Sequence, residues 1–177
     1  MKLLGMSGSL REASSNTRLL EAAALLAPAS VAVEIVTVLG DLPHFNPDLP
    51  VESHETLSRY IDSVRTCDGI LVSCPVYAGG YPGTFKNALD WLVGTDAFVE
   101  KPFAFLSTSN RVPAVQTSLA VVLQTMGGIH VAGATCLVPL LGTDLTLREI
   151  LGNTGFTATI EGALNAYTDY LRHRARH

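Results

Sequence analysis

A turn rich in serine follows the first apolar run of the sequence. Residues 7–17 read S-G-S-L-R-E-A-S-S-N-T and lead directly into a helical pattern. The first N–H groups of a helix have no acceptor within the helix and carry partial positive charge, so they attract anions. Serine and asparagine side chains add neutral donors, and Arg11 adds a charge-assisted one. The turn predicts a phosphate site; the alternative is that Ser14, Ser15 or Asn16 only caps the helix while Arg11 is solvated.

Three well-known chemistries do not match this turn. It contains no G-x-G-x-x-G, so it is not a dinucleotide fingerprint, and no G-K-[ST], so it is not a P-loop. Residues 5–9 approach the nucleophile elbow G-x-S-x-G, but Ser9 stands where the last glycine is required. The pattern therefore argues against a hydrolase.

A second turn, residues 74–82, has the composition of a platform for a planar ring. Gly79 and Gly80 carry no side chains and permit positive φ, so backbone N–H groups can approach ring heteroatoms. Tyr77 and Tyr81 offer aromatic faces or phenol donors. An ordinary turn with packed tyrosines is the alternative interpretation.

Apolar runs of strand length alternate with helical patterns along the chain. Runs without polar alternation are typical of parallel strands buried on both faces. The pattern predicts a flavodoxin-like three-layer α/β/α sandwich with a five-stranded parallel sheet in the order 2-1-3-4-5. The two turns would then meet at the carboxyl edge, where ligands bind. The runs span residues 2–6, 31–38, 69–73, 103–107 and 129–137, and the helical stretches span 16–26, 55–63, 82–92, 113–126 and 159–174.

Length and composition limit the classes of protein to consider. A chain of 177 residues is expected to form a single domain, 1–177. Because 47% of the residues are hydrophobic and only 16% charged, we expect some apolar surface to contact another subunit, in a homodimer or homotetramer. A net charge of -4 supplies no excess positive field, so a nucleic-acid partner is not expected.

Cysteine usage and hydropathy predict a cytoplasmic protein. The three cysteines are too few and too scattered for a disulfide framework. No apolar run approaches the roughly 18 residues needed for membrane insertion. His173 and His177 have a spacing that metal ligands use on a helix, but they belong to a charged terminal segment, so no metal site is expected. The proline-rich stretch 39–55 is expected to be a long surface loop.

The two turns together resemble those of the NADPH-dependent FMN reductases, a flavodoxin-like family that includes bacterial NAD(P)H-dependent quinone and chromate reductases. Its members have a G-S-L-R-x-x-S-x-N turn, seen here at residues 8–16. They also have a P-x-Y-x-x-x-x-P-G-x-x-K-N-A-x-D-W segment, seen here at residues 75–91. The second motif is the more specific, and the resemblance extends over most of the chain.

The resemblance implies FMN as cofactor, with its phosphate on the first turn and its isoalloxazine ring on the second. It also implies hydride transfer from NADPH or NADH to FMN and onward to a quinone, a flavin or a similar small acceptor, without a catalytic side chain. The implied binding residues are Ser9, Arg11, Ser14, Ser15, Asn16, Thr17, Pro75, Val76, Tyr77, Ala78, Gly79, Gly80, Ser107, Ser109 and Asn110.

The sequence departs from the family pattern near the expected ring site. Many members have Glu at the position of Val76 and Asn at that of Ala78, and many have a glycine pair in the turn that here spans residues 107–111. Two alternatives therefore stay open: an FMN-binding electron carrier, and a flavin-free binding module on the same fold. For Arg111 the interpretations are a solvated residue, a contact to a nicotinamide-nucleotide phosphate, or a cation near the flavin N1 and O2 atoms.

Overall fold

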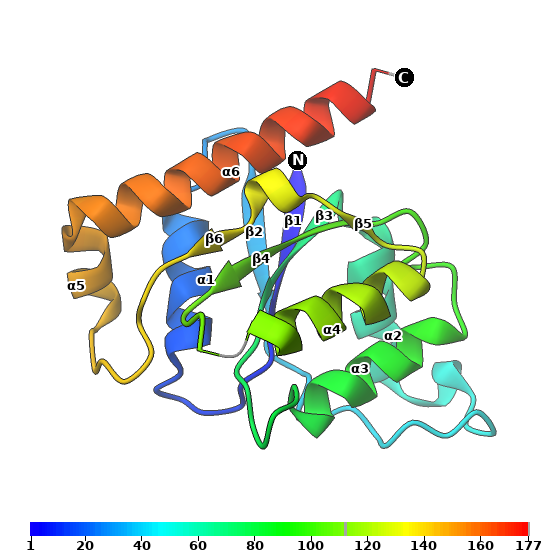
Figure 1. Ribbon diagram of the computed structural model, residues 1–177. Helices are drawn as coiled ribbons and strands as arrows, with labels where there is room; N and C mark the ends of the chain where they lie inside the picture. The colour runs from blue at the N-terminus through cyan, green and yellow to red at the C-terminus, as the bar shows by residue number, and fades with distance from the viewer. Residues whose placement is uncertain (112, 177) are drawn as a thin grey trace.

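The chain folds around a parallel sheet whose strand order reverses between its first and third strands. This computed structural model describes residues 1–111 and 113–176. The sheet order is β2-β1-β3-β4-β5, β6 pairs separately with β4, and every pairing is parallel (Figure 1). The predicted order 2-1-3-4-5 is confirmed. The strands are β1 (Lys2–Ser7), β2 (Ala32–Val36), β3 (Gly69–Ser73), β4 (Pro102–Ser107), β5 (Ile129–His130) and β6 (Cys136–Leu137).

Helices cover both faces of the sheet and complete the three predicted layers. Helices α1 and α6 pack on one face, and α2, α3 and α4 pack on the other (Figure 1). The helices are α1 (Ser15–Leu26), α2 (Glu55–Thr66), α3 (Gly83–Val93), α4 (Pro113–Thr125), α5 (Leu147–Gly152) and α6 (Thr154–Arg174). Two short 3-10 turns are η1 (Val51–Ser53) and η2 (Ala132–Ala134).

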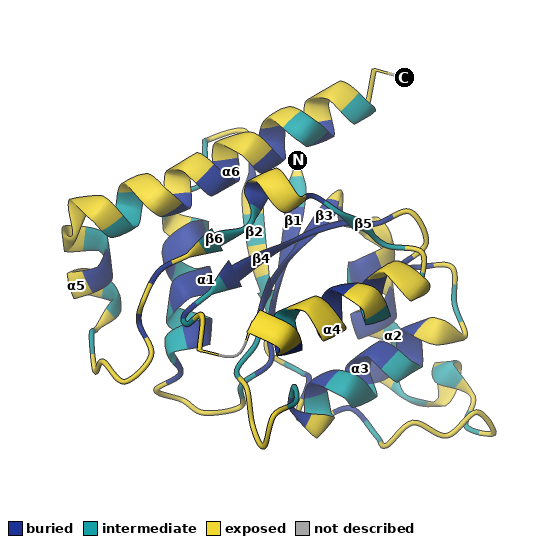
Figure 2. Ribbon diagram, viewed as in Figure 1, coloured by how far each residue is buried: buried dark blue, intermediate teal, exposed yellow. Residues whose placement is uncertain are grey.

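Successive side chains of the central strands point into two separate hydrophobic cores. In β3, Ile70 and Val72 belong to the core beneath α2, α3 and α4, whereas Leu71 belongs to the core beneath α1 and α6. Because a strand alternates its side chains between two faces, burial on both faces requires an unbroken apolar run. Figure 2 shows these strands buried between helices whose outer surfaces are exposed.

The prediction of one continuous strand over residues 129–137 was wrong. Strands β5 and β6 pair with opposite ends of β4, and the turn η2 separates them. Between them the Thr135 hydroxyl oxygen accepts a hydrogen bond from the Phe105 N–H at 3.3 Å, in place of a strand partner. The interruption contains Ala-Gly-Ala, whose residues have weak strand propensity. Because the residues on either side are mostly apolar, the run still has the pattern of a single strand.

The C-terminal helical region is longer than predicted. Helix α5 was not predicted, and α6 begins at Thr154 instead of residue 159. A capping box starts α5: the Thr146 hydroxyl oxygen accepts from the Glu149 N–H, and the Glu149 carboxylate accepts from the Thr146 N–H. The side chain of Asn153 caps α6 by accepting from the N–H groups of Gly155 and Phe156.

Two residues of the second motif hold the proline-rich loop that follows β2. The Asn87 Oδ1 atom accepts from the Phe45 N–H at 2.7 Å, and its Nδ2 donates to the Pro43 carbonyl at 2.9 Å. Trp91 Nε1 donates to the same carbonyl at 2.8 Å, and its ring meets Phe45 edge-on with centroids 5.1 Å apart. Asn87 and Trp91 therefore anchor this loop to α3.

The amino ends of β3 and β4 are joined through the side chain of Tyr167 from α6. Its hydroxyl oxygen accepts from the Ile70 N–H at 2.8 Å, and the hydroxyl lies 2.7 Å from the Pro102 carbonyl, to which it donates. Tyr167 is fully buried. A Cβ atom at Gly69 would collide with the Tyr167 hydroxyl, so this close approach requires glycine.

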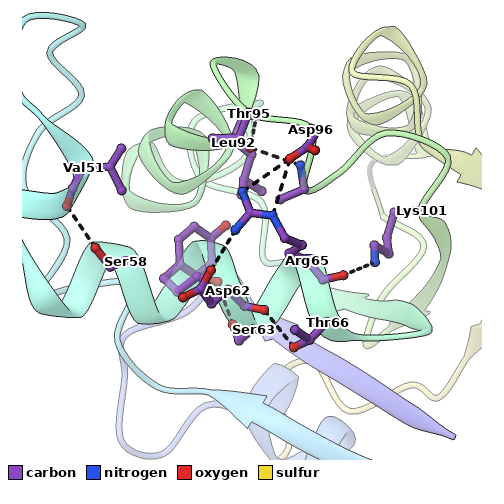
Figure 3. A network of polar contacts seen from close by, with 12 residues as sticks. Val51, Ser58, Asp62, Ser63, Arg65, Thr66, Leu92, Thr95, Asp96 and Lys101 are labelled. Carbon is purple, nitrogen blue, oxygen red and sulfur yellow. Dashed lines mark hydrogen bonds and ion pairs between the residues drawn. The ribbon is translucent and has the colours of Figure 1, made fainter.

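A polar network fixes the end of α2 beside the start of β4. Lys101 Nζ donates to the carbonyls of Arg65 and Cys67 at 3.1 and 2.6 Å. The Arg65 guanidinium pairs with Asp62 on its own helix and with Asp96 in the segment after α3 (Figure 3). The ammonium group of Lys101 thus has protein partners although the residue is only 9% exposed.

Candidate functional site

The first predicted turn connects β1 to α1 and keeps hydroxyl groups available at the helix start. Ser14 is the N-cap, and its Oγ accepts from the Thr17 N–H at 3.3 Å. Ser9 Oγ accepts from the Arg11 N–H, also at 3.3 Å. These bonds use only acceptor capacity, so both O–H groups remain able to donate to an anion. Capping by Ser14 and an anion site at this turn are therefore compatible.

Asn16 links three elements at the carboxyl edge of the sheet. It is 4% exposed, and its Oδ1 accepts from the hydroxyls of Ser73 at 3.0 Å and Thr108 at 3.3 Å. Ser73 ends β3, and Thr108 follows β4. Asn16 therefore fixes the start of α1 relative to the turns that follow β3 and β4.

Thr17 contacts the end of β1 and does not line the cavity at the carboxyl edge of the sheet. Its Oγ1 lies 2.8 Å from the Oγ of Ser7, a residue buried at the end of β1. This hydrogen bond ties the first turn of α1 back to the strand that precedes it. The sequence pattern did not indicate this contact between Thr17 and Ser7.

The second predicted turn is closed by a pair of main-chain hydrogen bonds. The N–H of Tyr77 donates to the Gly80 carbonyl at 2.8 Å, and the N–H of Gly80 donates to the Tyr77 carbonyl at 2.9 Å. The two residues between them, Ala78 and Gly79, have φ values of 49° and 77°. Positive φ at both central positions is the geometry of a type I′ turn. Glycine adopts positive φ readily, which explains Gly79 at the second of these positions. The tip is exposed.

The third turn follows β4 and is held from two sides without glycine. The Thr108 carbonyl accepts from the N–H groups of Leu140 and Leu141, both at 3.1 Å. The Ser107 hydroxyl donates to the Gln116 Oε1 atom of α4 at 3.1 Å. These contacts place the segment after β6 and the start of α4 beside the turn.

The three turns enclose a cavity of about 360 Å³ at the carboxyl edge. This volume lies within the range of roughly 300–1,000 Å³ that small-molecule sites occupy. The predicted residues that line it are Ser9, Arg11, Ser14, Ser15, Asn16, Pro75, Val76, Tyr77, Ser107 and Ser109. The predicted residues that do not line it are Thr17, Ala78, Gly79, Gly80 and Asn110.

The cavity has further walls that were not among the predicted binding residues. They are Val72, Cys74, Tyr81, Phe105, Thr108, Arg111, Val115, Gln116, Leu119 and Leu141. The apolar residues among them have the spacing of ordinary core positions, so no sequence signal separates them from the core. Gln116 is followed by Thr117 and Ser118 in α4, so its polarity alone does not mark it as a lining residue.

The cavity carries positive charge. Arg11 and Arg111 line it, and its described lining contains no aspartate or glutamate. Neither guanidinium forms an ion pair with a carboxylate of residues 1–111 or 113–176. Burial raises the pKa of the Cys74 thiol to about 12, so this cysteine stays protonated and is not a nucleophile.

The residues present fit FMN. Hydroxyl donors, a helix start and the guanidinium of Arg11 are groups that could hold its phosphate in a cradle. Beyond the cradle, Pro75, Val76 and Tyr77 supply an apolar wall on which the ring of the same ligand can lie. The cavity thus combines donors suited to an anion with an apolar wall, as a phosphorylated planar cofactor requires.

Comparison with known proteins identifies the family. The family model described as NADPH-dependent FMN reductase matches residues 1–140, and the chain belongs to this family. A quinone reductase of Pseudomonas putida is 41% identical over 106 residues, which cover 58% of this chain and 56% of that protein. A 2-hydroxy-1,4-benzoquinone reductase of a Burkholderia species is 34% identical over 123 residues, which cover 68% and 66%. The match thus spans roughly half to two thirds of these relatives.

Solved structures show the same fold over nearly the whole chain. The flavoenzyme NAD(P)H:(acceptor) oxidoreductase FerB of Paracoccus denitrificans superposes with a TM-score of 0.80 at 25% identity, covering 97% of both chains. An NADH:FMN oxidoreductase in its apo form gives a TM-score of 0.68 at 22% identity, covering 98% of this chain and 89% of the other. The second likeness is evidence for the fold alone.

The described residues offer neither a metal cluster nor a membrane span. Within 1–111 and 113–176, no three His, Cys, Asp or Glu side chains gather as a metal site would need. His177, one of the two histidines considered as ligands, lies outside the described residues. In this part of the chain no helix is both long and apolar enough to span a bilayer.

Proposed function

We propose that the protein is an FMN-dependent NAD(P)H oxidoreductase that reduces quinones or similar small acceptors. The observation that carries this proposal is the meeting of an anion cradle and an apolar wall in one cavity, in a chain of the NADPH-dependent FMN reductase family. Bound FMN would supply the redox chemistry, namely acceptance of a hydride from NAD(P)H and transfer of two electrons to the acceptor. With NADPH, one proton and a quinone as reactants, NADP⁺ and the hydroquinone are the products.

The protein contributes binding and orientation rather than acid–base chemistry. Ser9, Ser14 and Arg11 hold the phosphate end of the cofactor, while Asn16 keeps the turns that contact it at a fixed separation. Rigid placement of this kind is what brings hydride donor and acceptor atoms to a near-attack separation of roughly 3–3.5 Å. With Cys74 protonated and no carboxylate in the described lining, no side chain is poised as a nucleophile or general base.

The exposed mouth of the cavity suits exchange of substrates. Val76 and Tyr77 are 39% and 52% exposed, so the apolar wall reaches the solvent. A nicotinamide and an acceptor can therefore use the same opening in turn. This supports ping-pong turnover with planar acceptors.

We also propose a cytoplasmic homo-oligomer, a dimer or a tetramer. The three cysteines are all free, as in a reducing compartment. Exposed valines at the end of α3, after it and on α4, namely Val93, Val99 and Val121, offer apolar surface to a second subunit. Light scattering on the purified protein measures the assembly.

The test of the proposed function is the flavin content and turnover of the purified protein. We expect a yellow protein, or one that takes up added FMN, whose flavin is bleached by NADPH without oxygen and reoxidised by a quinone. A flavin that stays oxidised with both NADPH and NADH would instead identify an electron carrier. A protein that neither contains nor takes up FMN would identify a flavin-free module and refute the proposal.

A further inference from the structure

The cavity contains a second cation, Arg111, besides the arginine assigned to the phosphate cradle. The chain as a whole has a net charge of -4, yet two guanidinium groups and no carboxylate belong to the described cavity lining. Charges of one sign in a cleft with low-dielectric walls concentrate ligands of opposite charge. Arg11 is already assigned to the cofactor phosphate, so Arg111 is left for another anionic group.

The two arginines belong to turns that follow different strands. Arg11 follows β1 and Arg111 follows β4, and β3 lies between these strands in the sheet. Neighbouring strands are about 4.8 Å apart, so the roots of the two turns are separated by roughly 10 Å. Arg111 therefore reaches the cavity from a different turn than Arg11 does, and we take it as a second anion contact.

The residues that line the cavity together with Arg111 indicate what kind of ligand could bind there. The Arg111 N–H donates to the Ser109 hydroxyl at 3.1 Å, which orders the backbone, and its guanidinium forms no ion pair with a carboxylate of the described residues. The same cavity presents the exposed side chains of Val76, Tyr77 and Leu141, which are 39%, 52% and 46% exposed. Apolar walls favour a planar hydrocarbon body, and one cation beside them favours one negative charge on that body.

We propose that Arg111 is a specificity-determining residue that selects electron acceptors carrying a negative charge on an aromatic ring. Suitable charges are an ionised ring hydroxyl, a carboxylate or a sulfonate. The proposal rests on the proposed quinone reductase function and adds the class of acceptor to it. The transferred electrons and protons are those given above, because the charged group takes no part in the reduction.

The kinetic test compares a charged and a neutral quinone. We would measure kcat/KM for 1,4-naphthoquinone-2-sulfonate and for 2-methyl-1,4-naphthoquinone in the wild type, Arg111→Gln and Arg111→Lys. Loss of a charge-assisted hydrogen bond is expected to lower the ratio of sulfonate to neutral kcat/KM about tenfold or more in Arg111→Gln. Arg111→Lys should restore part of the ratio. Added salt should lower the ratio in the wild type and leave that of Arg111→Gln nearly constant.

Arg148→Gln is the matched control for the loss of one positive charge. Arg148 is exposed on α5 and does not line the cavity. Its variant should keep the wild-type ratio. An equal fall of the ratio in both variants would mean that net charge, not Arg111, sets the preference, and would overturn the proposal.

A binding measurement separates recognition from catalysis. Naphthalene-2-sulfonate and naphthalene-2-sulfonamide have the same ring, accept no hydride and differ in charge. Calorimetry on the FMN-loaded protein should show tighter binding of the sulfonate in the wild type, and Arg111→Gln should remove most of that difference.

The outcomes separate this inference from the proposed function. If the wild type binds FMN and reduces the neutral quinone, but its sulfonate ratio does not change in Arg111→Gln, the acceptor proposal is wrong and the proposed function stands. The acceptor proposal is equally wrong if Arg111→Gln raises KM only for NADPH, or lowers the flavin potential and slows both quinones equally. If the wild type binds no FMN, the proposed function itself is wrong.

Discussion

At the amino edge of the sheet, polar side chains are paired within the protein, whereas at the carboxyl edge several of them face a cavity. The Tyr167 hydroxyl and the Lys101 ammonium each contact main-chain groups of neighbouring elements. Ser9, Arg11 and Arg111 line the opposite cavity, and both guanidinium groups there lack a described carboxylate partner.

The amino edge also has a cavity, of about 620 Å³, and its charged residues other than Arg176 have partners among the described residues. Arg174 pairs with Glu100 at 3.2 Å, although its Nη1 atom has no partner among the described residues, and Arg172 pairs with Asp169 at 3.3 Å. Volume alone therefore does not mark a binding site. The difference between the edges lies in whether polar groups are used for stability or left for a ligand.

The largest expected effect is the loss of stability when the Tyr167 hydroxyl is removed from the amino edge of the sheet. Tyr167→Phe leaves the buried Ile70 N–H without its acceptor and the Pro102 carbonyl without its donor. Such losses lower the free energy of unfolding by about 2–4 kcal/mol. Urea denaturation of the apo protein measures this, with FMN affinity of the folded variant measured beside it.

Tyr170→Phe is the control for Tyr167→Phe, because Tyr170 lies on the same helix and its side chain is only partly buried. It should unfold almost like the wild type. If Tyr167→Phe were as stable as this control, the amino edge would not depend on the buried hydroxyl. FMN affinity should be close to wild type in both variants, since neither residue lines the carboxyl-edge cavity.

The next largest effect is expected at the carboxyl edge, where removal of the Arg11 guanidinium should weaken FMN binding. Arg11→Ala removes the cation of the phosphate cradle, and a lost charge-assisted hydrogen bond weakens FMN binding by about 1.5–3 kcal/mol. The stability of the apo protein should hardly change, because Arg11 makes no described ion pair. Fluorescence titration of the apo protein with FMN gives the affinity, and Arg148→Ala controls for the lost charge. An unchanged dissociation constant would remove Arg11 from the cradle.

The sequence predicted the sheet and the two turns because their signals are local. Unbroken apolar runs indicate strands buried on both sides, and the turn residues from Ser7 to Thr17 and around Gly79 have side-chain or φ requirements that short motifs express. Parallel pairing then brings the turns after β1 and β3 together at one edge. The convergence of the two turns on one cavity could therefore be predicted before any coordinates.

The cavity walls formed by Gln116 and Leu141 could not be predicted, because they depend on packing between distant segments. Leu141 reaches the cavity through hydrogen bonds of its segment to Thr108, and Gln116 reaches it through Ser107. Neither contact has a sequence pattern. The break in the last strand was missed for the same reason, since the Thr135 hydroxyl replaces a strand partner only once β4 lies beside it.

The smallest expected effect is that of a substitution at Thr17, which tests whether its hydroxyl stabilises the fold or binds the ligand. Thr17 is among the binding residues that the resemblance implies, but its hydroxyl bonds to Ser7 and the residue does not line the cavity. Thr17→Val keeps the shape and removes this bond, so the apo protein should lose about 1 kcal/mol of unfolding free energy while its FMN dissociation constant changes little. Thr17→Ser, which retains the hydroxyl, should recover most of the stability. Weaker FMN binding in Thr17→Val that Thr17→Ser restores would instead return Thr17 to the cradle, and the hydroxyl would then serve both purposes at once.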